Sequence, residues 1–278
     1  IEQTVLQEVR TRLDGQMRQS VSEPLGIFRA DGMAVSVERC APGKSLWVSS
    51  GEWGASPQRK IADMEIGARW LTSFHQQTVS QRLPWNHQAI ERWVETPLAA
   101  YAQARTVSEA EARLFAYTGT HANKLIGAEL PLVWQHHDFA PWNLFRDGEQ
   151  LTVIDWEFNR DWESTRAGPA LCDLLYFVTY WNNVAHHLYT MQAELDGIRA
   201  LFLDARPRSQ SIQAARQTIA AYMTALQIDW RFLPLLLVHT WTERVVYSYG
   251  RAHKLVGRPG PSRAADKFAN YVGLLADH

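Results

Sequence analysis

Cysteine is nearly missing from this chain, whose 278 residues include only Cys40 and Cys172. Two such distant cysteines supply neither a disulfide framework nor the spacing of a zinc site, so a disulfide-stapled scaffold is excluded. Long hydrophobic runs are also missing. The most apolar stretch, Phe232 to Trp241, is about half as long as a bilayer-spanning helix. The opening residues do not read as a signal peptide, and we expect a protein of the reducing cytoplasm.

Neither sign of charge is in excess, because 28 Lys and Arg residues face 29 Asp and Glu residues. The resulting net charge of −1 predicts no electrostatic binding to nucleic acid or to an anionic membrane. What is present is an ordinary globular composition, 46% hydrophobic and 21% charged. The length is enough for one large domain or for two lobes with a sizeable core. The oligomeric state is not predicted by any of these features.

The apolar pattern predicts a small α/β region followed by a large helical one. Residues 1–14 have apolar side chains at helical spacing, and residues 25–40 read as two short strands around an Asp31-Gly32 turn. Pro42-Gly43 then breaks the pattern. We expect domains at 1–42 and 43–278. The second should contain helices near 59–77, 88–104, 108–124, 169–187, 189–203, 209–225, 229–255 and 262–277.

One polar cluster interrupts the helical region, in the segment WQHHDFAPWNLFRDGEQLTVIDWEF (134–158). Two apolar runs joined through Arg146–Glu149 read as a short β-hairpin with an Asp-Gly turn. Such a hairpin would return Asp155 to the side of Asp138 and Asn143, bringing three oxygen-bearing side chains together. The plainer reading is a solvated loop with turn-forming Asp and Asn.

This combination of residues suits phosphoryl transfer. Mg²⁺ is typically held by one or two protein carboxylates together with substrate phosphates. The reaction needs metal ions on the phosphates and a base that orients the attacking hydroxyl. An aspartate, an asparagine five residues later and an aspartate at a strand end supply these parts.

The ordered motifs resemble the aminoglycoside phosphotransferase and choline kinase-like family. His136-x-Asp138-x4-Asn143, followed by VIDWE at 153–157, is similar to the family's motif pair. Further matches cover most of the chain: SVERCAPGKSL resembles the last strand and hinge of the small lobe, WLTSFH (70–75) a helix end, and AGPALCDLLYF (167–177) the segment that braces the catalytic loop. Each piece alone is weak, and their common order makes the resemblance specific.

The resemblance implies an α+β, protein-kinase-like fold with two lobes. It also implies transfer of the γ-phosphoryl group of ATP or GTP, with Mg²⁺, to a hydroxyl of a sugar, an aminoglycoside-like compound or an amino alcohol. The implied roles, residue by residue, are a catalytic base at Asp138, magnesium ligands at Asn143 and Asp155, loop support from His136 and Asp173, adenine contacts near Glu38 and Cys40, and, at Glu8, the helix glutamate that pairs with a phosphate-binding lysine.

This sequence departs from the family pattern at two places. The residue between His136 and Asp138 is commonly glycine and is His137 here, so the backbone must accommodate a side chain or the ring reaches the substrate. The glycine-rich loop and the strand lysine are absent, since the chain opens in the helix that should follow them. We expect an N-terminally truncated chain, with those strands upstream of Ile1.

Two other classes of function remain open. Zinc or a metal pair bound by His136, His137, Asp138 and Asp155 would indicate a hydrolase. Against this, neighbouring histidines on a strand point to opposite faces, and Asn143 has no role in it. A nucleotide-binding pseudokinase would keep Asp155 and show no transfer.

A group of acidic residues follows the second motif. Glu157, Asp161 and Glu163 either attract a cationic acceptor or form a solvated loop.

Overall fold

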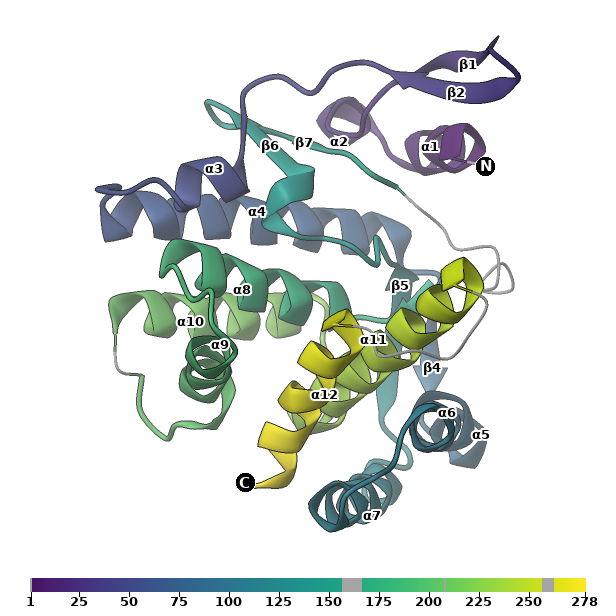
Figure 1. Ribbon diagram of the computed structural model, residues 1–278, viewed down its shortest axis with the longest axis vertical. Helices are drawn as coiled ribbons and strands as arrows, with labels where there is room; N and C mark the ends of the chain where they lie inside the picture. The colour runs from purple at the N-terminus through teal and green to yellow at the C-terminus, as the bar shows by residue number, and fades with distance from the viewer. Residues whose placement is uncertain (1, 157–166, 208, 257–262) are drawn as a thin grey trace. The chain divides into compact units, whose positions relative to one another are not determined.

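The computed structural model describes residues 2–156, 167–207, 209–256 and 263–278 (Figure 1). Glu157, Asp161 and Glu163 lie outside this range. Contacts group the chain into two units: one comprises 1–81, 131–188 and 208–226, and the other comprises 82–130, 189–207 and 227–278. Each unit is therefore assembled from three separate segments. The boundary expected near residue 42 concerns the lobes of a kinase-like fold and stays a prediction.

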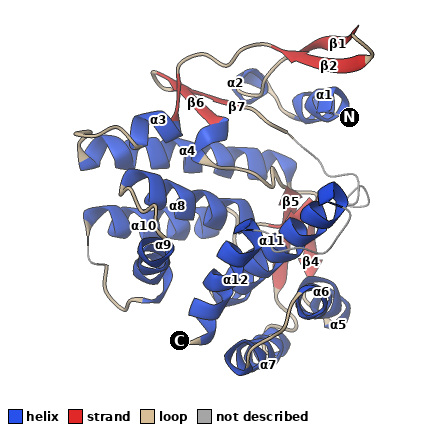
Figure 2. Cartoon of the chain, viewed as in Figure 1, coloured by secondary structure: helices blue, strands red, loops and turns tan. Residues whose placement is uncertain are grey.

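The first unit mixes helices with short strands (Figure 2). Its helices are α1 (Glu2–Arg12), α2 (Gly15–Gln19), α3 (Leu46–Ser50), α4 (Pro57–Thr78), α8 (Cys172–Ala185) and α10 (Gln210–Ala225). Its strands are β1 (Pro24–Ala30), β2 (Met33–Glu38), β3 (Lys44–Ser45), β6 (Leu144–Asp147), β7 (Gln150–Val153) and β8 (Ala167–Pro169), and β5 (Glu129–Trp134) joins them through its second half.

Both predicted hairpins are present. β1 pairs with β2, and Asp31 and Gly32 form the turn with φ of 51° and 77°. Two successive positive φ values are those of a type I′ turn, which matches the twist of the flanking strands. β6 pairs with β7 from Leu144↔Val153 to Asp147↔Gln150. The expected Asp-Gly turn is shifted by one residue, because Asp147 ends the strand and Gly148, at φ 59°, begins the turn.

Helix α4 forms the centre of the first unit. It begins at Pro57 behind a Ser56 cap, whose hydroxyl accepts the amide of Arg59, and Pro is favourable in this first turn. The helix contacts α3, α8, α10 and β7. Its Trp70 and Phe74 rings pack against the rings of Phe139 and Trp156. The wide apolar face predicted for 59–77 therefore covers the polar segment that contains Asp138.

The second unit is helical around α11. Its elements are α5 (His87–Ile90), α6 (Thr96–Ala104), α7 (Glu109–Asn123), α9 (Met191–Ile198), α11 (Phe232–Val256) and α12 (Arg263–Ala276), and β4 (Gln81–Pro84) spans the junction of the units. Short π-helical turns extend α5 into α6 and follow α9. Helix α11 packs on α6, α7 and α12. Among the described residues, no helix is both long and apolar enough to span a membrane.

Candidate active site

The polar segment begins where β5 ends at Trp134. β5 pairs with β8, and β8 leads directly into α8, so the register places the start of α8 beside the loop that follows β5. The helix predicted from residue 169 starts instead at Cys172, because Ala167–Pro169 is the strand that makes this pairing. Asp173, in the first turn of α8, is thereby brought to His136 and His137.

Asp173 accepts hydrogen bonds from two consecutive backbone amides of the loop. The amide of His136 donates to Oδ2 at 2.6 Å, and the amide of His137 donates to Oδ1 at 3.0 Å. Burial alone would raise the pKa of this carboxyl group. The nearby imidazole of His75, whose Nε2 lies 3.7 Å from Oδ2, outweighs burial and lowers the pKa of Asp173 to about 2. A buried carboxylate on backbone donors is a rigid anchor for a loop.

His136 ties the loop to the far end of the hairpin. Its Nε2 lies 2.9 Å from the carbonyl oxygen of Ile154, and its Nδ1 accepts the amide of Asp138 at 3.3 Å. These partners require the neutral tautomer with the proton on Nε2. Burial lowers the pKa of His136 and outweighs the charge of Asp173, which acts to raise it. The lowered pKa favours the same neutral form. Both ring nitrogens are therefore occupied by the protein itself.

Ile154 links the three predicted reactive positions. Its amide donates to the carbonyl oxygen of Asn143 at 3.0 Å, and its own carbonyl is held by His136. Asp155 follows directly, with a left-handed φ of 63° that turns the chain sharply after β7. The hairpin thus brings the residue before Asp155 into backbone contact with Asn143, which itself contacts Asp138.

Asp138 is half-buried and its carboxylate is held by three side chains. Trp142 Nε1 donates to Oδ2 at 3.2 Å, and Asn143 Nδ2 donates to the same oxygen at 3.0 Å. The hydroxyl of Tyr176 donates to Oδ1 at 3.1 Å. Asn143 Nδ2 also donates to the Asp138 carbonyl oxygen at 3.0 Å. Both carboxylate oxygens therefore have at least one side-chain donor.

The donor set fits a magnesium ion. Because the amide nitrogen of Asn143 is used on Asp138, the amide oxygen is the atom left for a cation. An amide oxygen and a carboxylate, completed by phosphate oxygens, are ligands that Mg²⁺ prefers. In the part of the chain that the structure describes, no group of three or more His, Cys, Asp and Glu side chains is arranged to hold a metal. The site therefore suits a cation shared with a substrate rather than an all-protein cage.

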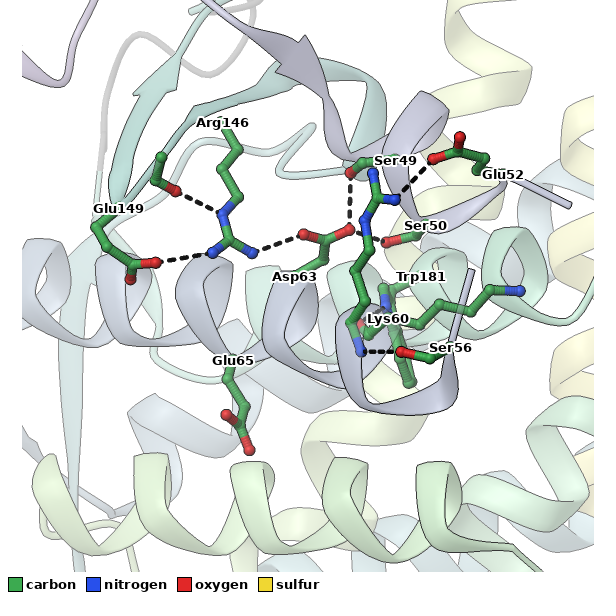
Figure 3. Close-up of polar contacts among 12 residues, drawn as sticks. Ser49, Ser50, Glu52, Ser56, Lys60, Asp63, Glu65, Arg146, Glu149 and Trp181 are labelled. Carbon is green, nitrogen blue, oxygen red and sulfur yellow. Dashed lines mark hydrogen bonds and ion pairs between the residues drawn. The ribbon is translucent and has the colours of Figure 1, made fainter. Parts of the chain in front are cut away.

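Arg146 fixes the β6–β7 hairpin to α4 (Figure 3). Its guanidinium donates to Oδ1 of Asp63 at 2.8 Å and to the exposed Glu149 at 3.0 Å. Asp63 is 1% exposed, and its other oxygen accepts the hydroxyls of Ser49 and Ser50 from α3. A buried carboxylate paired in this way joins the hairpin, α3 and α4. It therefore holds β6, which begins directly after Asn143, and β7, which ends two residues before Asp155.

The residues predicted to meet the nucleotide lie on α1 and at the end of β2. Glu8 is half-buried on α1, Glu38 is the last residue of β2, and Cys40 is exposed beyond it. The backbone near the predicted hinge is linked to the hairpin through Ser22, whose hydroxyl donates to the Arg39 carbonyl at 3.0 Å. The Ser22 amide donates to the Val153 carbonyl at 3.3 Å. The adenine and phosphate roles of these residues stay predictions.

The chain matches the profile of the phosphotransferase enzyme family (APH) over residues 2–209, which is well over half of its length. It belongs to this family. A search of curated proteins gave no match. Among solved structures, a glucosamine kinase has a TM-score of 0.60 at 16% identity, covering 97% of this chain and 65% of that kinase. The chain thus spans about two thirds of the length of that kinase.

Two further structures share the phosphotransferase fold. A glucosamine kinase in complex with glucosamine, ADP and inorganic phosphate has a TM-score of 0.58 at 16% identity. The match covers 98% of this chain and 66% of the kinase chain. A Ralstonia eutropha JMP134 protein assigned as an aminoglycoside phosphotransferase has a TM-score of 0.57 at 16% identity, with coverages of 98% and 81%. At these identities the likeness establishes the kinase-like fold.

His137 occupies the family's usual glycine position in a left-handed conformation, with φ of 63°. That conformation costs a residue with a Cβ about 1 kcal/mol, a cost that glycine avoids. Strand alternation does not separate the two histidines, because β5 ends at Trp134 and both histidines lie in a loop; that expectation was wrong. Zinc binding by His136 is disfavoured instead because both of its ring nitrogens already have partners.

Three residues of the candidate site were not identified as contacts from the sequence. Trp142 donates its indole N–H to Asp138. His75 ends a family-like motif and lies beside Asp173. Tyr176 carried one usable signal, its position one helical turn after Asp173 on the same predicted helix. Trp156 is 1% exposed, and its ring lies 4.5 Å from the ring of His136, centroid to centroid.

Proposed function

We propose that this protein transfers the γ-phosphoryl group of ATP to a hydroxyl group of a small molecule. The observation that carries the proposal is the contact between Asp138 and Asn143 together with the Ile154 bridge that brings the start of the Asp155 segment to Asn143. A base beside an amide–carboxylate pair is the arrangement that phosphoryl transfer requires. Family membership and the kinase-like fold support the same chemistry.

In the proposed reaction, Asp138 orients the acceptor hydroxyl and accepts its proton. A bond forms between the acceptor oxygen and the γ-phosphorus as the bond from that phosphorus to the leaving oxygen of ADP breaks. Asn143 and Asp155 would hold Mg²⁺, which neutralises charge on the phosphates. Asp173 and His136 keep the loop in place while the charge moves, so that little reorganisation accompanies the reaction.

The acceptor class proposed for the first assays is an amino sugar. Two of the structures that share the fold are glucosamine kinases, one of them bound to glucosamine and ADP. At identities near 16%, two proteins of the same fold can act on different substrates. Variable loops and helices of the large lobe normally determine which acceptor binds. Hexoses, aminoglycosides and amino alcohols therefore belong in the same panel.

The test is ADP release from Mg-ATP by the protein produced from its complete coding sequence, with D-glucosamine, glucose, kanamycin and choline as acceptors. Asp138→Ala and Asp155→Ala are each expected to lower kcat by about a thousandfold or more, because each removes an aligned charged group. Turnover like that of the wild type in either variant would overturn the mechanism. Mg-ATP binding with no transfer to any acceptor would identify a pseudokinase.

A further inference from the structure

The two oxygens of the Asp138 carboxylate are held in different ways. Oδ2 accepts from Trp142 Nε1 and Asn143 Nδ2, both within the same short loop. Oδ1 accepts from the hydroxyl of Tyr176, which is on α8. An ionised carboxylate has about two acceptor positions on each oxygen. Among the residues that the structure describes, two loop donors bind Oδ2, and the tyrosine hydroxyl is the donor to Oδ1.

Helix α8 holds the loop at two points that are one turn apart. Asp173 binds the backbone amides of His136 and His137, and Tyr176, three residues later, binds the side chain of Asp138. Residues at this spacing lie on the same face of a helix. Tyr176 is 4% exposed, so its ring is fixed by packing, and its hydroxyl marks a defined point in space.

A third aromatic residue packs against both of the aromatic side chains that donate to the carboxylate. The Tyr180 ring lies 4.6 Å from the ring of Tyr176 and 4.9 Å from the ring of Trp142, centroid to centroid. Trp47 of α3 packs edge-on against Trp142 at 5.9 Å. Aromatic contacts of this kind stabilise the rings beyond the area that they bury. The carboxylate is therefore clamped from both sides by packed rings.

We propose that Tyr176 is a positioning residue that sets the rotation of the Asp138 carboxylate and directs Oδ1 to the acceptor hydroxyl. This inference rests on the proposed phosphotransferase function. Without the tyrosine hydroxyl, Oδ2 stays bound to the loop and Oδ1 loses its direction. A misplaced base lowers the rate of the chemical step, because alignment is most of what a kinase supplies. Nucleotide binding does not depend on this contact.

The decisive variant is Tyr176→Phe, which removes the hydroxyl and keeps the ring. Tyr117→Phe is the matched control, since Tyr117 is 61% exposed on α7. ADP release is measured from Mg-ATP with D-glucosamine and with water as acceptor. We expect kcat to fall about 10- to 100-fold in Tyr176→Phe, with the KM for ATP within about twofold of the wild-type value. Mg-ATP binding stoichiometry, read by tryptophan fluorescence, should stay at that of the wild type, which excludes loss through misfolding.

Asp138→Ala, measured in parallel, separates the two proposals. If Asp138→Ala is inactive and Tyr176→Phe keeps its kcat within twofold, the role of Tyr176 is overturned and the proposed function stands. If Asp138→Ala keeps its turnover, the proposed function fails first. If the wild type turns over neither acceptor, crystal structures with Mg-ADP decide: the Asp138 carboxylate should rotate in Tyr176→Phe, and an unchanged carboxylate overturns the inference.

Discussion

Asp173 shows how a single side chain from another element can stabilise the loop that carries Asp138. The carboxylate is buried, accepts two loop amides and lies beside His75. Its pKa is lowered from 3.8 to about 2. A group whose pKa is depressed in the folded state adds stability above its unfolded pKa, and that stability is lost as the pH falls through the folded pKa. The relevant window is therefore between about pH 4 and pH 2.

The stabilisation by Asp173 should disappear in acid. A shift of this size corresponds to about 2 kcal/mol. We expect the difference in unfolding free energy between wild type and Asp173→Asn to shrink by about that amount from pH 6 to pH 2, measured by urea denaturation. Asp277→Asn is the control, because Asp277 is exposed at the end of the chain. A difference that does not change with pH would contradict the lowered pKa.

At the scale of elements, the packing of α4 on α8 determines where Asp173 and Tyr176 of α8 lie. Gly67 of α4 faces the ring of Phe177 on α8, and a Cβ at Gly67 would lie 2.6 Å from Phe177 Cζ. Phe177 is fully buried. The two helices can approach this closely only because residue 67 has no side chain, and Phe177 directly follows Tyr176.

Gly67→Ala is expected to destabilise the protein by about 1–3 kcal/mol, because overpacking outweighs the better helix propensity of alanine. Gly119→Ala is the matched control: Gly119 also lies within a helix, and nothing lies within 4 Å of its added Cβ. That change should be neutral or stabilise by about 0.5–1 kcal/mol. Urea denaturation measures both. If both substitutions changed the free energy of unfolding equally, the close contact between α4 and α8 at Gly67 would not require glycine.

At the scale of the whole molecule, the proposed function predicts a metal-dependent response to nucleotide. Mg-ATP at about 100 times its Kd stabilises a protein by about 2.7 kcal/mol. For a chain of this size we expect Tm to rise by about 5 to 10 °C in a thermal melt. Mg-GTP, tested alongside, establishes which base the hinge accepts. Asp155→Asn or EDTA should remove most of the shift, and an undiminished shift would contradict the role of Asp155.

Local signals predicted most of the secondary structure and the polar cluster of this chain. Apolar periodicity located the long helices, and Asp31-Gly32 and Asp147-Gly148 located the hairpins, because these signals act within a few residues. The start of α8 was misplaced because pairing of β8 with β5 is a long-range event. The same limit applies to Tyr176 and Arg146, whose partners Asp138 and Asp63 are far away in the sequence.

The one-turn spacing of Asp173 and Tyr176 also constrains the length of the segment between them. Each residue added to an α-helix rotates everything beyond it by about 100°. Insertion or deletion of a single codon between positions 173 and 176 would therefore swing the tyrosine off the face that meets Asp138, although no reactive residue is changed. Substitutions at Leu174 and Leu175 keep the number of residues unchanged, so Asp173 and Tyr176 stay on the same face of the helix. In this part of the gene, frame-preserving insertions and deletions should be far more harmful than conservative missense changes.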